Sequence, residues 1–299
     1  MACSGGGSAG PPVAADAHHV AAYAPPGPRC DPTGAFGAPI ALASLESAAD
    51  DVCPRLTADE LTIVFSRRNA DNTYDIYQAT RGKPTDPFGA PQVLGTVNSI
   101  YTDVWPTLTP DGLGIYFMSD RITTGTYHVW SATRAAIGDA FGTPTEVMAL
   151  MNGDNFPYVT ATGTGLYFAS SDRPDTSGMS DMYRAPLDGS GTLGTPAILV
   201  GAVNTTANEL VPVVTSDELT LYFCRDNATD CDIWTATRAS ATAPWGTASP
   251  LAGESTVGID EVPSWVSPDG CDLYFYDNGS GGSGGEDMYE LARPAPTSG

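Results

Sequence analysis

The chain has 299 residues, with 35 Asp and Glu against 13 Lys and Arg, and a formal net charge of -22 at pH 7. This charge argues against nucleic acid as a partner, because proteins bind nucleic acid by neutralising its phosphates with Lys and Arg. It suits a cationic or basic partner, or it simply keeps the protein soluble.

The N-terminal segment differs from the rest of the chain. Residues 1–34 are rich in Gly, Ala and Pro without periodicity, which predicts a disordered tether ahead of one folded domain over residues 35–295. The start, Met1-Ala2-Cys3-Ser4, resembles a mature bacterial lipoprotein whose leader has been replaced by Met. We therefore expect Cys3 to be lipidated, with an arbitrary linker as the alternative. The expected location is the periplasm, the outer membrane as a lipoprotein, or the extracellular space, and the only membrane contact would be this anchor.

One pattern then returns five times, at intervals of roughly 50 residues, and a period of that size is typical of propeller blades or solenoid turns. Each copy holds an acidic residue, a Pro-containing run, a turn, an aromatic strand, a polar loop and an Asp-aliphatic-aromatic motif. The copies begin at Asp51, Asp103, Asp154, Glu209 and Glu261.

Each copy supplies four strand candidates, because aromatic and β-branched residues are enriched between Gly, Pro and Asp turns. In order they are a short strand such as residues 105–109, a second such as 114–118, a third such as 74–79, and a fourth after Phe-Gly-x-Pro at 88–91. Four strands per repeat are typical of a β-propeller.

The fifth copy has no fourth strand behind it, while a Phe-Gly-x-Pro strand at residues 36–42 has no repeat ahead of it. Because an open sheet edge promotes aggregation, we expect the N-terminal strand to complete the last blade. The predicted fold is all-β: a five-bladed β-propeller of four-stranded antiparallel blades, closed by the N-terminal strand and expected to be a monomer.

The string from Pro106 to Arg121 and the Asp-Ile-Tyr at Asp75 to Tyr77 resemble the TolB-type (WD-repeat-like) β-propeller family. The resemblance covers roughly residues 36–293 and implies the fold more than an activity. Members of that family serve as periplasmic partners, outer-membrane-associated modules or domains attached to peptidases. The second copy departs from the pattern, with His128 in place of the Asp.

Strand direction predicts how the cysteines pair. Cys224 and Cys231 meet at the mouth of one hairpin, and Cys30 and Cys271 lie on the same face of the disc, so both pairs meet the short Cα separation that a disulfide needs. Cys53 starts a strand on the opposite face and should be free. Two disulfides indicate an oxidising compartment.

The repeated carboxylates are the expected metal ligands. They precede the first strand, which lines the channel of a propeller, so Asp51, Asp103, Asp154, Glu209 and Glu261 should ring the channel mouth. Oxygen-rich clusters suit calcium, so calcium is the expected cofactor. The alternative is structural, because a residue present in every repeat usually serves the repeat.

Residues that break the repeat symmetry on the same face are the expected ligand-binding residues, because arginine and aromatic side chains often anchor binding surfaces. They are Arg55, Trp105, Phe156, Tyr158, Arg121 and His128. The leading hypothesis is a secreted or lipid-anchored module that binds a small molecule, a glycan or a protein.

Enzyme motifs such as S-x-x-K and H-E-x-x-H are missing from the sequence, so a binding role is favoured over catalysis. The alternative is a glycoside hydrolase that uses two channel carboxylates, which need defined separations for retaining or inverting hydrolysis. A purely structural envelope protein is a third interpretation.

Overall fold

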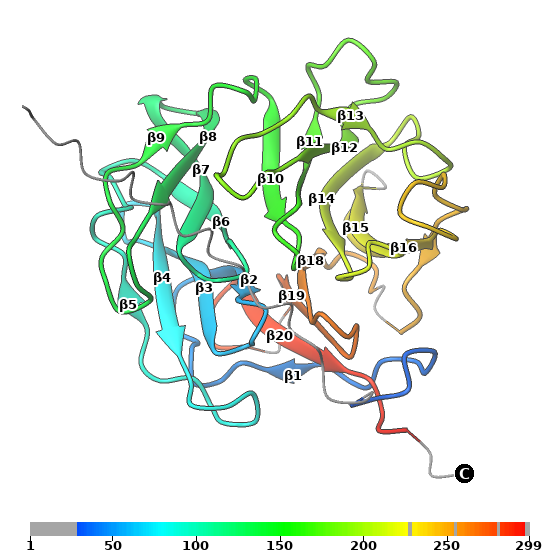
Figure 1. Cartoon of the computed structure of the whole chain (residues 1–299). Helices are drawn as coiled ribbons and strands as arrows, with labels where there is room; N and C mark the ends of the chain where they lie inside the picture. The colour runs from blue at the N-terminus through cyan, green and yellow to red at the C-terminus, as the bar shows by residue number, and fades with distance from the viewer. Residues whose placement is uncertain (1–28, 227–228, 254–255, 280–281, 297–299) are drawn as a thin grey trace, which may run out of the picture.

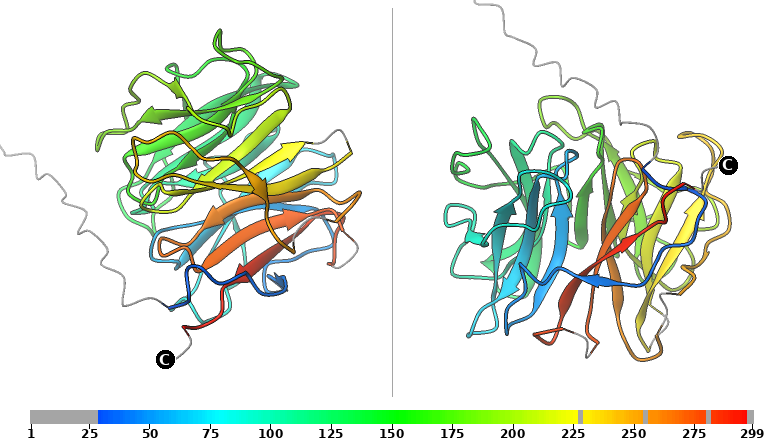
Figure 2. Two further views of the ribbon diagram at one scale, coloured as in Figure 1. Left: turned by 90° about the vertical axis from the view of Figure 1, so that its right-hand side faces the viewer. Right: turned by 90° about the horizontal axis from the view of Figure 1, so that it is seen from below.

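The chain forms five four-stranded antiparallel sheets arranged around a central axis as a five-bladed β-propeller, which confirms the predicted fold (Figures 1 and 2). The structure, a computed structural model, describes residues 29–226, 229–253, 256–279 and 282–296. Cys3 and most of the expected tether lie outside these residues. In the described part of the chain, no helix has the length and apolar character needed to cross a membrane.

The innermost strands contact one another around the axis (Figure 1). They are β2 (Asp51–Leu56), β6 (Asp103–Leu108), β10 (Asp154–Val159), β14 (Asn208–Val214) and β18 (Glu261–Val266). The second strands are β3 (Thr62–Arg68), β7 (Gly114–Thr123), β11 (Gly165–Ser170), β15 (Thr220–Asp226) and β19 (Asp272–Asp277).

The third strands are β4 (Tyr74–Thr80), β8 (Thr126–Thr133), β12 (Asp181–Pro186), β16 (Cys231–Thr237) and β20 (Asp287–Ala292). The outermost strands have two residues each: β5 (Gln92–Val93), β9 (Thr145–Glu146), β13 (Ala197–Ile198), β17 (Ser249–Pro250) and β1 (Ile40–Ala41). Short outer strands leave little sheet edge for another chain to pair with.

A repeated phenylalanine on the second strand forms the core of each blade. All five are fully buried, and burying such a side chain stabilises the fold by roughly 1.5–3 kcal/mol. They are Phe65, Phe117, Phe168, Phe223 and Phe275.

The N-terminal strand takes the fourth place in the last blade. Strand β1 pairs with β20, with Ile40 opposite Glu290. The amide of Gly37 donates to the carbonyl of Ala292 at 2.9 Å, as Gly89 does to Thr80 in the first blade at 2.9 Å. The predicted closure is therefore confirmed by pairing and by loop geometry.

The aromatic residue of the Phe-Gly motif explains why this strand fits. In the first blade the guanidinium of Arg81 lies 4.3 Å above the ring centroid of Phe88. In the last blade Arg293 lies 4.1 Å above Phe36 in the same way. The motif therefore holds the outer strand through an arginine at the end of the third strand, and residues 36–42 bring the missing aromatic partner.

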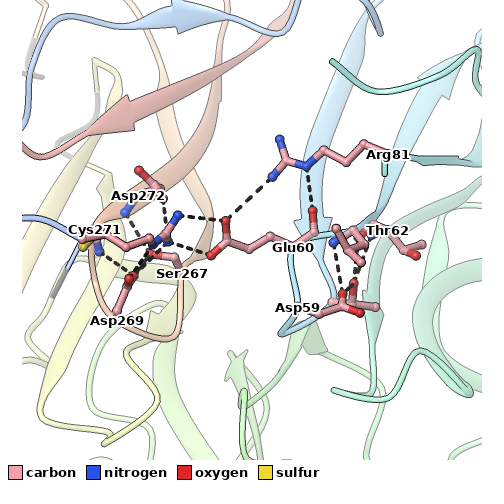
Figure 3. A network of polar contacts seen from close by, with 11 residues as sticks. Asp59, Glu60, Thr62, Arg81, Ser267, Asp269, Cys271 and Asp272 are labelled. Atoms are coloured by element: carbon pink, nitrogen blue, oxygen red, sulfur yellow. Dashed lines mark hydrogen bonds and ion pairs between the residues drawn. The ribbon is translucent and has the colours of Figure 1, made fainter. Parts of the chain in front are cut away.

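A covalent and an ionic contact fix the N-terminal segment further. Cys30 and Cys271 form a disulfide with Cα atoms 5.7 Å apart. Arg29 bonds to Glu60 at 2.7 Å, Asp269 at 2.7 Å and Asp272 at 3.0 Å, and Figure 3 shows these three carboxylates converging. The folded part therefore includes Arg29 and Cys30, ahead of the expected boundary at residue 35.

The other cysteines also follow the prediction. Cys224 and Cys231 form the second disulfide, with Cα atoms 5.5 Å apart. Cys53 is buried and free.

The repeated carboxylates are the first residues of the innermost strands, or the second in β14, and each is buried. Strand β6 therefore begins two residues earlier than predicted. In four blades an arginine from the end of the second strand, or from the loop after it, neutralises the carboxylate. The pairs are Arg67–Asp51, Arg121–Asp103, Arg173–Asp154 and Arg225–Glu209. We call each of these a carboxylate–arginine pair.

Two aromatic rings support each of these arginines. The guanidinium of Arg225 lies 5.2 Å from the ring centroid of Phe223 and 4.3 Å from that of Trp234. The same arrangement recurs around Arg67, Arg121 and Arg173. Because a buried carboxylate is costly unless it is paired, these contacts set where each innermost strand begins.

Blade five breaks this pattern. In the strand register Glu261 faces Asp277, where Glu209 faces Arg225 in blade four. Glu261 is only 3% exposed, and burial raises its pKa to about 7. One blade therefore begins with a carboxylate that no arginine neutralises.

Deleting residues 1–45 should cause aggregation and lower the melting temperature, because it removes β1, Phe36 and Cys30 and exposes the edge of β20. Deleting residues 1–28 is the matched control and should preserve both properties. Light scattering and calorimetry would measure the difference. A soluble and equally stable 1–45 deletion would contradict the closure.

The free energy of unfolding should fall as the pH rises from 4.5 to about 7, and Glu261 should cause part of the fall. The folded state keeps a proton on Glu261, whose pKa burial raises from 4.5 to about 7, while the unfolded chain releases it. This contribution is complete below pH 4.5 and lost above about pH 7. One pKa unit corresponds to about 1.4 kcal/mol, so the loss is on the order of 3 kcal/mol.

Urea denaturation of Glu261→Gln at several pH values would test this, and its profile should be flatter than that of the wild type. Some slope should remain, because burial also raises the pKa of Glu60 to about 7. Glu209→Gln is the matched control. It should lose about 3 kcal/mol, because Arg225 would stay without its partner. An unchanged slope in Glu261→Gln would refute the assignment.

Candidate functional site

The five carboxylates expected to bind calcium do not converge at the channel mouth. Side chains alternate along a strand, and the residue after the carboxylate, such as Val104 or Leu210, lines the channel-mouth cavities instead. The expectation that the ring faces the channel is therefore wrong, because none of the five carboxylates lines these cavities and four of them turn toward arginines. The geometry favours the structural alternative, and calcium binding at this ring stays a prediction.

One group of carboxylates in the described residues has oxygens close enough to share a metal ion, namely Glu60, Asp269 and Asp272. Arg29 bonds to all three, so a guanidinium already supplies the positive charge there (Figure 3).

The channel mouth is instead shaped by strained residues that lie two positions after the carboxylate in four of the innermost strands. Cys53, Trp105, Phe156 and Val211 have φ angles of 59°, 56°, 58° and 52°, in the left-handed region. The register of each strand shifts at this point, which marks a β-bulge. Bulges re-aim side chains and are common beside functional sites.

Three of these bulged residues line a cavity of about 380 Å³ at the face where the innermost strands begin, namely Trp105, Phe156 and Val211. A second cavity of about 360 Å³ adjoins it, and both are lined by Trp105, Phe156, Tyr276 and Glu286. We call the two together the channel-mouth cavity.

Aromatic rings form the apolar side of the channel-mouth cavity. The ring centroids of Trp105 and Phe156 lie 4.6 Å apart, edge to face, and those of Trp105 and Tyr276 lie 5.8 Å apart. These contacts hold the indole of Trp105 in one orientation, because edge-to-face packing is favourable. The rings therefore form a rigid corner rather than a mobile surface.

Carboxylates form the polar side. Glu286 lines both halves of the cavity, and burial together with the charge of Asp50 raises its pKa. The hydroxyl of Tyr74 donates to Glu286 Oε2 at 3.3 Å. Asp260 is fixed at the rim, where it accepts from the amide of Cys231 at 2.8 Å.

No Lys, Arg or His lines the channel-mouth cavity in the part of the chain that the structure describes, while four carboxylates and three aromatic rings surround its first half. The carboxylates are those of Asp226, Asp230, Asp260 and Glu286, and the rings are those of Trp105, Phe156 and Tyr276. Arg68 does not line the cavity and pairs with Asp50 at 2.7 Å. Negative charge beside aromatic faces is the chemistry that binds cations.

Of the six predicted ligand-binding residues, Trp105 and Phe156 line the cavity. Arg55 and Tyr158 are 0% and 1% exposed, so the expectation that they lie on the surface is wrong. They lie two residues beyond the bulge and fill the channel, with the Arg55 guanidinium 5.2 Å from the Tyr158 ring centroid. The hydroxyl of Tyr158 donates to the carbonyl of Val214 at 3.0 Å.

The two remaining predicted residues have partners elsewhere. Arg121 belongs to a carboxylate–arginine pair, so it is a structural group. The Nδ1 atom of His128 lies 2.7 Å from Glu146 Oε1, toward the outer edge of blade two. Neither lines the channel-mouth cavity.

Sequence comparison of the repeats missed Tyr276 and Glu286. Tyr276 follows the repeated Phe275, where other copies have residues such as Met118 and Cys224, which also line the cavity. Glu286 precedes the repeated Asp287 of the third strand. Tracing these two variable positions through all five copies would have found both residues.

Comparisons with known proteins address the fold. No family model matches the chain, and no curated protein sequence matches it. Among solved structures, TolB from Acinetobacter baumannii has a TM-score of 0.51 and 16% identity, over 84% of this chain and 56% of that chain. The chain therefore spans little more than half the length of that TolB.

Two glycoside hydrolase structures are similar to the same degree. A thermostable family-43 glycoside hydrolase has a TM-score of 0.53 and 14% identity, over 83% of this chain and 90% of that chain. The α-L-arabinofuranosidase of Podospora anserina, in complex with cellotriose, has a TM-score of 0.52 and 13% identity, over 90% and 99%. At these identities the similarity establishes a shared propeller fold alone. The function has to be argued from the residues of the cavity.

Proposed function

We propose that the protein is an extracytoplasmic binding module that holds a cationic group, such as a quaternary ammonium, in the channel-mouth cavity. The observation that carries the proposal is the composition of this cavity: Trp105, Phe156 and Tyr276 beside Glu286 and Asp260, without a basic lining residue among the described residues.

The physical argument has two parts. A cation over an aromatic face gains roughly 0.5–2 kcal/mol, and the gain is largest for Trp. A carboxylate beside it adds Coulomb attraction that grows as water is excluded. The net charge of -22 draws cations toward the whole molecule.

The two disulfides support the location, because such bonds persist in oxidising compartments. Similarity in fold to TolB agrees with a role outside the cytoplasm. Lipidation of Cys3 belongs to the same proposal and would restrict the module to a membrane surface.

Choline should bind and quench the fluorescence of Trp105, while its neutral isostere 3,3-dimethylbutan-1-ol should bind at least about tenfold more weakly. Trp105→Ala and Glu286→Gln should each weaken choline binding by about tenfold. Asp86→Asn removes the same charge from an exposed site and is the matched control. Equal affinity for choline and the isostere would refute the proposal.

Choline binding should also weaken in acid. Because burial raises the pKa of Glu286 above its ordinary value of 4.5, this carboxylate loses its charge at a higher pH than an exposed glutamate does. Titrating affinity from pH 8 downward should show a loss that Glu286→Gln lacks. A calcium titration belongs in the same series, and competition by calcium would show that the cavity prefers a metal ion.

A glycoside hydrolase is the second candidate. The observation that favours it is Glu286, a carboxyl group with a raised pKa that shares its cavity with Asp260, since a general acid must keep its proton near neutral pH. Four of the five repeated carboxylates are unsuitable for this chemistry, because they are buried against arginines.

Incubation with p-nitrophenyl α-L-arabinofuranoside and with xylan would test the second candidate. Release of nitrophenol or reducing sugar that disappears in Glu286→Gln, with Asp86→Asn unaffected, would establish hydrolysis. Binding of choline without hydrolysis would favour the binding module.

A further inference from the structure

Blade five contains most of a carboxylate–arginine pair but not the arginine. Glu261 occupies the carboxylate position, and Phe275 and Tyr289 stack with ring centroids 5.4 Å apart, as Phe65 and Tyr77 do beneath Arg67 at 5.9 Å. The register position of the arginine holds Asp277. We call Glu261, Asp277, Phe275 and Tyr289 the blade-five carboxylate site.

No Lys or Arg of this chain serves the blade-five carboxylate site. All 13 of them lie in the described residues, and their ion pairs involve other carboxylates. Arg55, Arg134 and Arg293, which form no ion pair, contact Tyr158, Phe141 and Phe36 instead. The positive charge that completes four blades is therefore missing from the fifth.

An unpartnered atom marks where that charge would bind. Glu261 Oε1 accepts from the amide of Thr256 at 3.0 Å. Glu261 Oε2 is buried and finds no hydrogen-bond partner among the residues that the structure describes. In blade four, by contrast, Glu209 Oε1 accepts from Thr205 at 2.5 Å and from Arg225 at 2.9 Å. A buried oxygen without a donor costs roughly 1–3 kcal/mol, so a donor from outside would gain by supplying the bond.

We propose that the blade-five carboxylate site binds a guanidinium group supplied from outside the chain. The four other blades demonstrate the preference directly, because each holds a guanidinium between a carboxylate and two aromatic faces. A guanidinium is planar, stacks on aromatic rings and donates in a fork that matches a carboxylate. A metal ion fits less well, because Glu261 and Asp277 belong to no convergent group of ligand atoms in the described residues.

The blade-five carboxylate site is separate from the channel-mouth cavity. Asp260 and Val262 line that cavity, while the side chain of Glu261 between them points to the opposite face of the sheet. The two sites therefore share a strand but not a ligand, and each can be removed without the other.

Methylguanidinium is the probe, and isothermal titration calorimetry in the Glu286→Gln background isolates the blade-five site from the channel mouth. Methylguanidinium should bind, and methylammonium should bind at least about tenfold more weakly, because it lacks the planar fork. Glu261→Gln should weaken methylguanidinium binding by about tenfold or more.

Asp277→Arg is the decisive variant, because it places an arginine at the register position that Arg225 occupies in blade four. It should abolish methylguanidinium binding and raise the melting temperature. Asp277→Asn is the matched control, which removes the charge without filling the space, and should retain measurable binding. Choline binding to Asp277→Arg with Glu286 intact should be unchanged.

The guanidinium could come from an arginine of a partner protein or from a free guanidinium compound. Binding of a pentapeptide with a central arginine, compared with its lysine counterpart and with methylguanidinium, distinguishes these sources. Tighter binding of the arginine peptide than of methylguanidinium indicates an arginine on a partner protein, and equal binding indicates a free guanidinium compound. Absence of binding by both, or binding that Asp277→Arg leaves intact, would overturn the proposal. If methylguanidinium binds but choline does not, the proposed function of the channel-mouth cavity is overturned and the proposal for the blade-five carboxylate site is supported.

Discussion

A buried carboxylate at the start of the innermost strand is the constraint on which the rest of the blade depends. It accepts hydrogen bonds from the incoming loop, as Asp51 does from Ser47 at 2.8 Å, and an arginine from the second strand or the loop after it neutralises it. The arginine lies over aromatic rings from the second and third strands. One ionic contact thereby joins the incoming loop and three strands, which explains why charge and aromatic residues recur together in the repeat.

The channel mouth follows a different principle, because it is built from positions that the repeat does not specify. Bulges at Trp105, Phe156 and Val211 turn these side chains toward the axis without disturbing the carboxylate two residues earlier. The scaffold and the cavity therefore use different residues of the same strand. Substitutions at the cavity positions can change the ligand while the carboxylate–arginine pairs keep the blade in place.

The fold could be predicted because its determinants are local and repeated: Phe-Gly-x-Pro motifs, turns and buried phenylalanines. Both disulfides followed from strand direction alone. The cavity could not be predicted, because the direction of a side chain depends on the bulge, which shifts the register by one residue. The carboxylates were assigned to the channel for the same reason, and their arginines, such as Arg67, were visible in the sequence only as loop residues.

The Cys30–Cys271 disulfide decides how the protein carries mechanical force. The pairing of β1 with β20 involves two residues per strand, and such a short edge separates one hydrogen bond at a time when it is pulled. Tension applied ahead of Cys30 passes through the disulfide to the start of β19, one strand further inside the sheet, and does not load β1. The ring therefore withstands pulling from its N-terminal side under oxidising conditions, and reduction would turn the same segment into one that peels open.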